Sequence, residues 1–506
     1  MIENDLHRDN FVEQLFREAH RRGGLTRPAF VTDGTTYTFS DVYEGVEQAA
    51  AVLAAHAVEA GDSVLLILPD GIDLVRIFLG AAWLGAVPII ANYELHAAEL
   101  ERGAEIARPK VVIGMPGITV TTNRPMIPLD EFKTRRRGER PPAAAPCGPE
   151  TPAYALLTSG TTGGPRLCVH THQDPYAIHA SFGDGLLRLT ERDVSYSVSR
   201  MYFSYGLCNS VFYPQFSGTA SFLTPTRPSP LAALATIRDF GVTVFYAQPS
   251  FYARLLAEPH HEVLDRLRLA IVGGELLSPS LEAGLRELLG ERLINVIGAT
   301  EVGNVFACAS PGAARPGWIG PPVPPYRMRV VNEREESIGT GAEGRLQVLG
   351  STVTFGIGHF GESVNHGTGS WWPTGDTAVI AEDGFVRVLG RADDMEIIGG
   401  VNVHPAEIED FLVEHPRVLE AAVCAIRKNA EPTRLRAYIV AAAGVDTVAL
   451  GDELRTEARQ RLTWYKVPDE VAFIAELPRT PTGKLNRRLL RELANGTATA
   501  SEVVSA

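Results

Sequence analysis

Short apolar runs alternate with amphipathic stretches along the chain. Residues 64–68 are continuously apolar, as expected of a strand that is covered on both faces. The apolar residues of 11–22 recur with a helical period, and Ser40 is placed to cap a second helix through about His56. The pattern predicts further helices through Leu84 and near 97–106, strands at 87–90 and 111–113, and a hairpin around 33–34. This alternation predicts a parallel sheet with crossover helices.

The same pattern continues into the second half of the chain, with strands predicted at 242–245, 269–272 and 293–297. Glycines follow the last two of these strands directly, at the edge where open α/β sheets bind ligands. Residues 323–353 are β-rich, and the C-terminal part combines two strands with flanking helices. We therefore predict an α/β protein: a large N-terminal domain of parallel-rich sheets with flanking helices plus a β-rich subdomain, and a small α+β C-terminal domain.

The predicted domain boundaries follow from these changes of pattern. The N-terminal domain is expected at 1–390, with subdomains of about 1–150, 151–320 and 321–390. A hinge is expected at 391–394, the C-terminal domain at 395–495 and a disordered tail at 496–506.

Charge and cysteine usage narrow the class of protein. The net charge of −13 argues against a general nucleic-acid binder. The five cysteines are scattered without CxxC spacing, which fits a reducing cytoplasm. The polar N-terminus is unlike a signal peptide, and no apolar run reaches the ~20 residues that span a bilayer. We predict a cytoplasmic protein without a nucleic-acid or membrane partner; a homodimer is one option that the sequence leaves open.

Residues 157–172, LTSGTTGGPRLCVHTH, combine glycines, small hydroxyl residues and one cation. Backbone N–H groups and hydroxyls of such a loop can converge on one anion, because glycine lets the main chain approach a ligand closely. Arg166 adds a charge-assisted contact. The segment is not a Walker loop, since no Gly-Lys-Ser/Thr ends it. Taken alone, such a segment is more often a solvated glycine turn, so the phosphate hypothesis depends on the motifs that follow.

Four further motifs follow in order: Gly298-Ala299-Thr300-Glu301, Trp372-Pro373-Thr374-Gly375-Asp376, Gly390-Arg391-Ala392-Asp393-Asp394 and Pro481-Thr482-Gly483-Lys484. With the glycine-rich loop they resemble the core motifs of the adenylate-forming superfamily of acyl- and aryl-CoA ligases, carrier-protein adenylation domains and luciferases. The resemblance extends over roughly 11–493 and is strongest to benzoate- and hydroxybenzoate-CoA ligases. It implies an AMP-forming acid–thiol ligase with a mobile C-terminal domain, and ATP, Mg²⁺ and CoA as cofactors.

The resemblance also implies how the nucleotide is bound. The phosphates would lie against Thr158, Ser159, Gly160, Thr161, Thr162 and Arg166. The adenine would lie against Gly273, Gly274, Glu275, Ile297, Gly298 and Ala299. Asp376 would bind the ribose hydroxyls, with Arg391 as a second contact. Arg166 stands where the family usually carries lysine, and Leu167 where it usually carries glycine. Taken alone, Asp376 is an ordinary turn residue and Arg391 an ordinary surface ion pair.

Activating a carboxylate with ATP requires one anion to attack another, so repulsion must be screened and the reactants aligned. By resemblance, Thr300 contacts the α-phosphate, Glu301 holds Mg²⁺, and Lys484 bridges the carboxylate and the α-phosphate. Asp393 matches the hinge, and Gly399-Gly400 match the loop that lines the pantetheine tunnel. Thr300-Glu301 alone would also suit a helix start. His170 and His172 share a face of a predicted strand, but no other His or Cys cluster supports a metal site there.

Residues 201–209, MYFSYGLCN, resemble the aryl pocket of benzoate-type ligases and give Phe203, Ser204, Tyr205 and Gly206 as candidate substrate contacts. Those ligases commonly carry histidine three residues after the glutamate, where this chain has Asn304. A polar pocket favours an amino- or hydroxy-substituted benzoate such as 3-hydroxyanthranilate over plain benzoate. The alternatives are an enzyme that releases the adenylate or loads a carrier protein, and a non-catalytic nucleotide-binding homologue.

Overall fold

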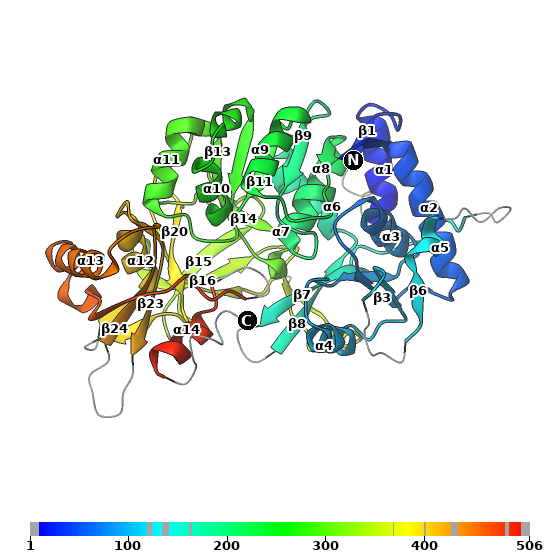
Figure 1. The fold of residues 1–506 in the computed structure, drawn as a ribbon. Coiled ribbons are helices and arrows are strands. Elements are labelled where there is room, and N and C mark those ends of the chain that lie inside the picture. The colour runs from blue at the N-terminus through cyan, green and yellow to red at the C-terminus, as the bar shows by residue number, and fades with distance from the viewer. Residues whose placement is uncertain are drawn as a thin grey trace.

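The computed structural model describes residues 10–118, 124–133, 141–160, 164–367, 369–398, 401–426, 434–480 and 485–496. Figure 1 shows two large sheets with their helices, followed by a β-rich part and by a smaller C-terminal part drawn in orange and red. Several predicted site residues lie outside the described residues: Thr161, Thr162, Gly399, Gly400 and Lys484. The predicted tail lies outside them from residue 497 on.

The first large sheet has six strands in the order β6-β5-β3-β4-β7-β8. Their bounds are β3 (Ser63–Ile67), β4 (Val87–Ile90), β5 (Val111–Gly114), β6 (Met126–Pro128), β7 (Pro152–Gly160) and β8 (Gly164–Thr171). All neighbours are parallel except β7 and β8, which form an antiparallel hairpin. Alternate residues of β3 pack into different cores, Val64 and Leu66 on one face and Leu65 and Ile67 on the other. This confirms a strand that is covered on both faces.

The second large sheet has eight strands in the order β14-β13-β12-β11-β9-β10-β1-β2. Their bounds are β1 (Pro28–Thr32), β2 (Thr35–Thr38), β9 (Val194–Ser197), β10 (Ala220–Phe222), β11 (Val244–Ala247), β12 (Leu269–Val272), β13 (Leu293–Gly298) and β14 (Val305–Cys308). The interior pairs are parallel, and only the two edge pairs, β1–β2 and β13–β14, are antiparallel. The carboxyl ends of β12 and β13 therefore lie side by side.

Helices cover both large sheets (Figure 1). They are α1 (Phe11–Arg21), α2 (Phe39–Ala55), α3 (Ile72–Trp83), α4 (Ala97–Ala107), α5 (Leu129–Lys133), α6 (Asp174–Ile178), α7 (Ser204–Leu207), α8 (Tyr213–Ser217), α9 (Pro230–Asp239), α10 (Pro249–Leu256) and α11 (Pro279–Leu289). The prediction that Ser40 caps α2 is wrong. Thr38 is the cap: its hydroxyl accepts from the N–H of Asp41, whose carboxylate accepts from the N–H of Thr38. This reciprocal pair satisfies two backbone donors, which a cap at Ser40 would leave unpaired.

The β-rich region is an antiparallel sheet in the order β15-β16-β19-β20. Its strands are β15 (Arg327–Val331), β16 (Glu343–Leu349), β19 (Trp372–Ile380) and β20 (Val386–Arg391), beside the short pair β17 (Thr354–Phe355) and β18 (Asn365–His366). The bridge Gly320–Val386 connects this sheet to the chain that follows β14.

The C-terminal part has a core of its own, formed by the apolar faces of two helices and a three-stranded sheet. Its elements are β21 (Glu396–Ile398), β22 (Val401–Val403), α12 (Pro405–Val413), β23 (Val418–Ile426), β24 (Arg434–Ala441), α13 (Thr447–Arg461), β25 (Glu470–Phe473) and α14 (Arg487–Ala494). The predicted fold class is thereby confirmed. Among the described residues, no helix is both long enough and apolar enough to cross a membrane.

Side chains tie the segment at 391–396 to the last helix. Asp394 lies between two arginines of α14, with Oδ2 3.1 Å from Nε of Arg487 and Oδ1 3.1 Å from Nη2 of Arg491. Arg491 also pairs with the buried Glu396 and donates to the backbone oxygen of Asp393. One further bond spans the predicted domain boundary: Nε2 of His404, just before α12, lies 2.8 Å from Oε1 of Glu343 on β16.

Candidate active site

The hairpin of β7 and β8 carries the predicted phosphate loop at its tip. Thr158 lies opposite Arg166 in the register, and its hydroxyl is 3.5 Å from the backbone oxygen of Arg166. The neighbouring Leu167 is fully buried in a core and exchanges two backbone hydrogen bonds with Ile357, each 2.9 Å long. Leucine in place of glycine therefore anchors the hairpin, while the Arg166 side chain stays exposed.

The hairpin and the Thr300-Glu301 motif meet at Cys168. Burial raises the pKa of this thiol well above its usual value, and the negative charge of Glu301 raises it further. The Thr158 hydroxyl and the Arg166 guanidinium act on the same thiol in the opposite direction. Three side chains of the two motifs, those of Thr158, Arg166 and Glu301, therefore act on the same thiol.

The motif itself folds as a short 3-10 turn, η5 (Thr300–Val302), directly after β13. The Thr300 hydroxyl lies 3.3 Å from that of Ser204, the first residue of α7. On the other side, Nε2 of His170 lies 2.7 Å from the Thr300 carbonyl oxygen. Thr300 is therefore fixed between the predicted acid pocket and the hairpin.

The predicted adenine contacts lie where β12 and β13 end. Gly273 and Gly274 follow β12, and Gly274 has a φ of +90° that favours glycine. The Glu275 carboxylate is engaged by Ser250 on α10, accepting from its N–H and its hydroxyl at 3.1 Å each. The Glu275 side chain thus caps the first turn of α10. Only the backbone of Gly273-Gly274-Glu275 is then available for the predicted contact with adenine.

Position 298 requires glycine because two segments of the chain approach each other closely there. Ile297 pairs with Ala307, and the register shifts at Gly298. A Cβ atom at Gly298 would lie 2.3 Å from the backbone oxygen of Asn304, the same oxygen that accepts from the N–H of Ala299. Any larger residue would displace the turn that carries Thr300.

Asp376 and Arg391 are cross-strand partners on β19 and β20. Arg391 Nη1 lies 3.1 Å from Asp376 Oδ1 and also donates to the Thr374 backbone oxygen at 2.8 Å. The structure thus brings the two predicted ribose contacts together.

The candidate aryl-pocket residues surround α7. Tyr205 donates to the backbone oxygen of Ile271, and Gly206 is required because a Cβ there would lie 2.0 Å from the oxygen of Arg200. Phe203, at the N-terminal end of α7, contacts the ring of Tyr202. Asn304 is buried, and its Nδ2 has no hydrogen-bond partner among the described residues. Its side chain lies close enough to Cys208 to affect the pKa of that thiol.

One residue of this region, Asp174, was missed as a functional candidate from the sequence. Asp174 accepts from the N–H and the hydroxyl of Thr171 and lies 3.0 Å from Nδ1 of His170. The spacing Thr-x-x-Asp before a short helix is a capping signal and could have identified Asp174. His172, two residues from His170, accepts instead from the N–H of Phe11, so the two histidines do not form a metal site.

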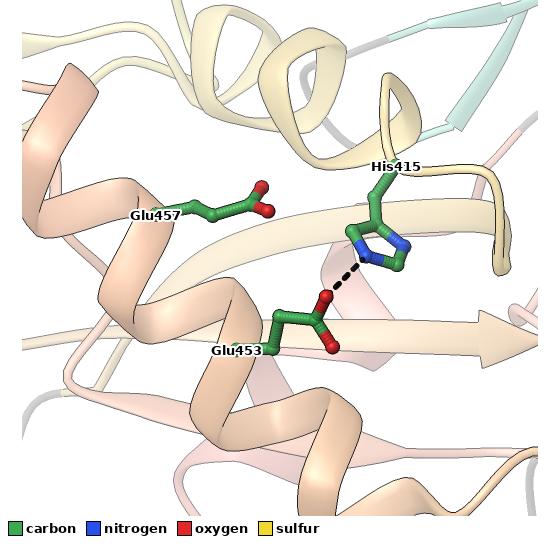
Figure 2. A group of neighbouring side chains, drawn as sticks. All are labelled: His415, Glu453 and Glu457. Atoms are coloured by element: carbon green, nitrogen blue, oxygen red, sulfur yellow. Dashed lines mark hydrogen bonds and ion pairs between the residues drawn. The ribbon is translucent and has the colours of Figure 1, made fainter.

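His415, Glu453 and Glu457 form a cluster on the C-terminal domain, with ligand atoms within 4.8 Å of one another (Figure 2). The N–H of Arg417 donates to Nδ1 of His415, and Nε2 faces Glu453 at 3.4 Å. A metal-bound histidine needs its hydrogen on the other nitrogen, where it can donate to a neighbour. Glu453 is also paired with the Arg417 guanidinium. We therefore assign the cluster to structural ion pairing.

The chain is similar to known protein families over most of its length. Residues 16–357 match the AMP-binding enzyme family, and residues 407–484 match the AMP-binding enzyme C-terminal domain. The p-hydroxybenzoic acid–AMP ligase of Mycobacterium tuberculosis is 34% identical over 96% of this chain and 69% of its own. The 4-hydroxybenzoate–CoA/benzoate–CoA ligase of Rhodopseudomonas palustris is 31% identical over 97% of this chain and 95% of its own.

A solved structure extends the likeness to three dimensions. The anthranilate CoA ligase AuaEII in complex with anthranoyl-AMP superposes with a TM-score of 0.87, at 27% identity, over 97% of this chain and 98% of that one. Sequence family, fold and the juxtaposition of the motifs agree, and the chain belongs to the AMP-binding enzyme family, the adenylate-forming superfamily of acid–thiol ligases.

Proposed function

We propose that this enzyme activates an amino- or hydroxy-substituted benzoate with ATP and then transfers the aryl group to the thiol of CoA. The observation that carries the proposal is the contact between Ser204 and Thr300 at 3.3 Å. A carboxylate can attack the α-phosphorus only if the acid pocket adjoins the α-phosphate site. Ser204 belongs to the proposed acid pocket and Thr300 to the proposed phosphate site, so their contact supports in-line attack.

In the first half-reaction, a carboxylate oxygen forms a bond to the α-phosphorus and pyrophosphate leaves with its electron pair. Thr158, Ser159, Thr161 and Arg166 hold the departing phosphates, and Asp376 and Arg391 hold the ribose. Lys484 stabilises the charge that develops between the carboxylate and the α-phosphate. In the second half-reaction the thiol sulfur bonds to the aryl carbonyl, AMP leaves, and the thiol proton is released.

A divalent cation fits the same site. Glu301 offers carboxylate oxygens, the ligand type that Mg²⁺ takes when it is shared with substrate phosphates. Mg²⁺ would be held by Glu301 and would supply charge neutralisation to the phosphates.

The choice of acid rests on the polar groups of the proposed pocket. The unpartnered Nδ2 of buried Asn304 can donate to a ring substituent, and an unpaired buried group costs about 1–3 kcal/mol. The named substrates of the relatives, p-hydroxybenzoate, 4-hydroxybenzoate or benzoate, and anthranilate, are all benzoates. A hydroxy- and amino-substituted acid such as 3-hydroxyanthranilate would satisfy such donors, and we propose it as a member of the substrate class.

A second candidate concerns the acceptor. One relative is named as an aryl–AMP ligase, with no thiol in its name. An enzyme that stops at the adenylate or loads a carrier-protein phosphopantetheine arm uses the same first half-reaction.

For the enzyme that uses CoA, we also propose a movement of the C-terminal domain between the two half-reactions. Residues 391–394 would be the hinge, and Gly399-Gly400 would lie beside the thiol arm.

Exchange of radiolabelled pyrophosphate into ATP, measured with a panel of substituted benzoates, tests the first half-reaction. We expect exchange with amino- and hydroxybenzoates. Absence of exchange with every aryl acid would contradict the proposed function. Mass analysis after addition of CoA then separates the acceptors, because an aryl-CoA product supports the CoA ligase and accumulation of aryl-AMP alone supports the second candidate.

A further inference from the structure

His170 is a buried residue of β8 whose ring contacts the η5 turn. Its side chain is 0% exposed, and that of Asp174 is 3% exposed. Nδ1 lies 3.0 Å from Oδ2 of Asp174, and Nε2 lies 2.7 Å from the carbonyl oxygen of Thr300. The proposed mechanism does not use this residue, yet it is in direct contact with the turn that carries Thr300.

The partners of the ring determine where its hydrogens lie. A carbonyl oxygen can only accept, so Nε2 must carry a hydrogen. The Asp174 carboxylate accepts from the N–H and the hydroxyl of Thr171, and its Oδ2 lies 3.0 Å from Nδ1 of His170. Asp174 therefore holds the ring at the nitrogen opposite to the one that faces Thr300.

An aromatic ring packs against the imidazole. The ring of Tyr154 stacks on His170, with centroids 5.0 Å apart and planes 19° from parallel. Burial raises the pKa of Tyr154 well above its usual value. The stack fixes the plane of the imidazole and thereby the direction in which Nε2 points.

We propose that His170, held by Asp174, is a positioning residue for adenylation: its Nε2–H fixes the Thr300 carbonyl and thereby the orientation of the Thr300-Glu301 peptide. The proposal rests on the proposed function of these two residues. The same oxygen also accepts from the N–H of Gly303 at 3.0 Å, so both of its lone pairs are used. In a trans peptide the N–H points opposite to the C=O, so holding the oxygen at His170 directs the N–H of Glu301 away from His170.

Two substitutions of His170 each remove one of the two hydrogen bonds that the imidazole makes, to Asp174 or to Thr300. The amide nitrogen of Asn can reach the place of Nδ1, and that of Gln the place of Nε2. His170→Asn therefore keeps the donor to Asp174 and loses the donor to Thr300, whereas His170→Gln does the reverse. We expect His170→Asn to lower kcat/KM for ATP in pyrophosphate exchange and the affinity for AMP by about 10- to 100-fold, because a buried carbonyl oxygen loses its side-chain donor. His170→Gln should stay within about 3-fold of wild type, because it keeps the donor to Thr300.

Thermal unfolding of both variants is the control for a merely structural role. Equal losses in the two variants, following their loss of stability, would overturn the proposal. Binding of AMP does not require catalysis, so the ratio of the AMP affinities of the two variants tests the positioning role even if the wild-type enzyme shows no exchange. Absence of wild-type exchange would overturn only the proposed function.

Nitrogen NMR of the histidine rings gives an independent reading. Nε2 of His170 should carry a hydrogen, because the Thr300 carbonyl oxygen that faces it can only accept. His172 on the same strand is the internal control. Its Nδ1 accepts from the N–H of Phe11 at 3.1 Å, and burial lowers its pKa to about 4, so it should show one protonated and one bare nitrogen, with the bare nitrogen at Nδ1. A bare Nε2 on His170 would overturn the proposal.

Discussion

Arg391 donates from Nη1 to Oδ1 of Asp376 across two antiparallel strands, at 3.1 Å. The pair places a carboxylate with a fixed orientation beside the proposed hinge. A carboxylate accepts from two ribose hydroxyls at once, whereas an amide offers only one acceptor oxygen.

Asp376→Ala should therefore lower kcat/KM for ATP by about 100-fold, and Asp376→Asn by less, because charge-assisted hydrogen bonds contribute about 1.5–3 kcal/mol each. The KM for the aryl acid should change little. Pyrophosphate exchange at varied ATP measures both constants. Asp383→Ala, at an exposed aspartate preceding β20, is the matched control. A loss of acid affinity alone would contradict the ribose assignment.

Lys484→Ala should abolish adenylation selectively. A preorganised electrostatic contact to the reacting groups contributes roughly 3–4 kcal/mol, so adenylate formation should fall by orders of magnitude. Thioester formation from supplied aryl-AMP should survive. The two half-reactions are measured separately, and Lys133→Ala, an exposed lysine on α5, serves as the control. Equal loss in both half-reactions would refute the assignment.

Asp393→Pro should separate the half-reactions in the opposite way. Asp394 is fixed to α14 by two arginines, whereas Asp393 faces Arg391, with Nε of Arg391 3.5 Å from its Oδ1. We therefore propose that the hinge rotation takes place at Asp393. Proline fixes φ there, so adenylate should still form while thioester does not. Asp393→Ala keeps the backbone rotatable, and if it behaved like the proline variant, the effect would come from the side chain.

Asn304→Leu should weaken the preference for substituted benzoates. The substitution removes a buried amide whose Nδ2 has no partner among the described groups, so a ring hydroxyl oxygen loses its donor while plain benzoate loses none. The ratio of kcat/KM values for the substituted acid and benzoate should fall by about 10-fold. A wild-type enzyme that prefers benzoate, or a straight-chain fatty acid, would refute the pocket assignment while leaving the adenylation chemistry intact.

The stability of the C-terminal domain should depend on Asp410 of α12. Burial raises the pKa of this carboxyl to about 7, and the charges of Glu409 and Glu407 add to the effect. The folded protein holds the proton more tightly than the unfolded chain, so the free energy of unfolding falls as the pH rises from about 4 through the folded pKa.

Asp410→Asn should consequently raise the free energy of unfolding by about 1–2 kcal/mol at about pH 8 and change it little at about pH 4. Urea unfolding at the two pH values, followed by hydrogen exchange of α12 and α13, measures the difference. The control is Asp452→Asn on the exposed face of α13. An equal effect at both pH values would contradict the pKa shift of Asp410.

Hydrophobic pattern predicted the interior strands well, because their burial on both faces leaves an unbroken apolar run. The strand of 269–272 is predicted with its observed bounds. The cap of α2 was misplaced because Ser40 and Thr38 are both good caps, and only the reciprocal bond with Asp41 distinguishes them.

The candidate site residues could be named because they stand in motifs that resemble those of the adenylate-forming superfamily. The contacts between them were not found, since they join distant parts of the chain. His170 and Thr300 are separated by 130 positions, and no local pattern links a strand histidine to a backbone oxygen of a later turn. Asn304 could be named from its place after Glu301, but its unpartnered amide is a property of the packing alone.

The hydrogen bond between Glu343 and His404 adds an energetic cost to the start of the proposed domain movement. Any reorientation of the C-terminal domain must break this 2.8 Å contact on departure and restore it on return. A net cost of about 0.5–1.5 kcal/mol corresponds to a dwell time in this arrangement that is lengthened about 2- to 10-fold. Glu343 on the N-terminal domain would thus lengthen the lifetime of this arrangement. Substituting Glu343, which is not among the proposed nucleotide or acid contacts, would shorten that lifetime.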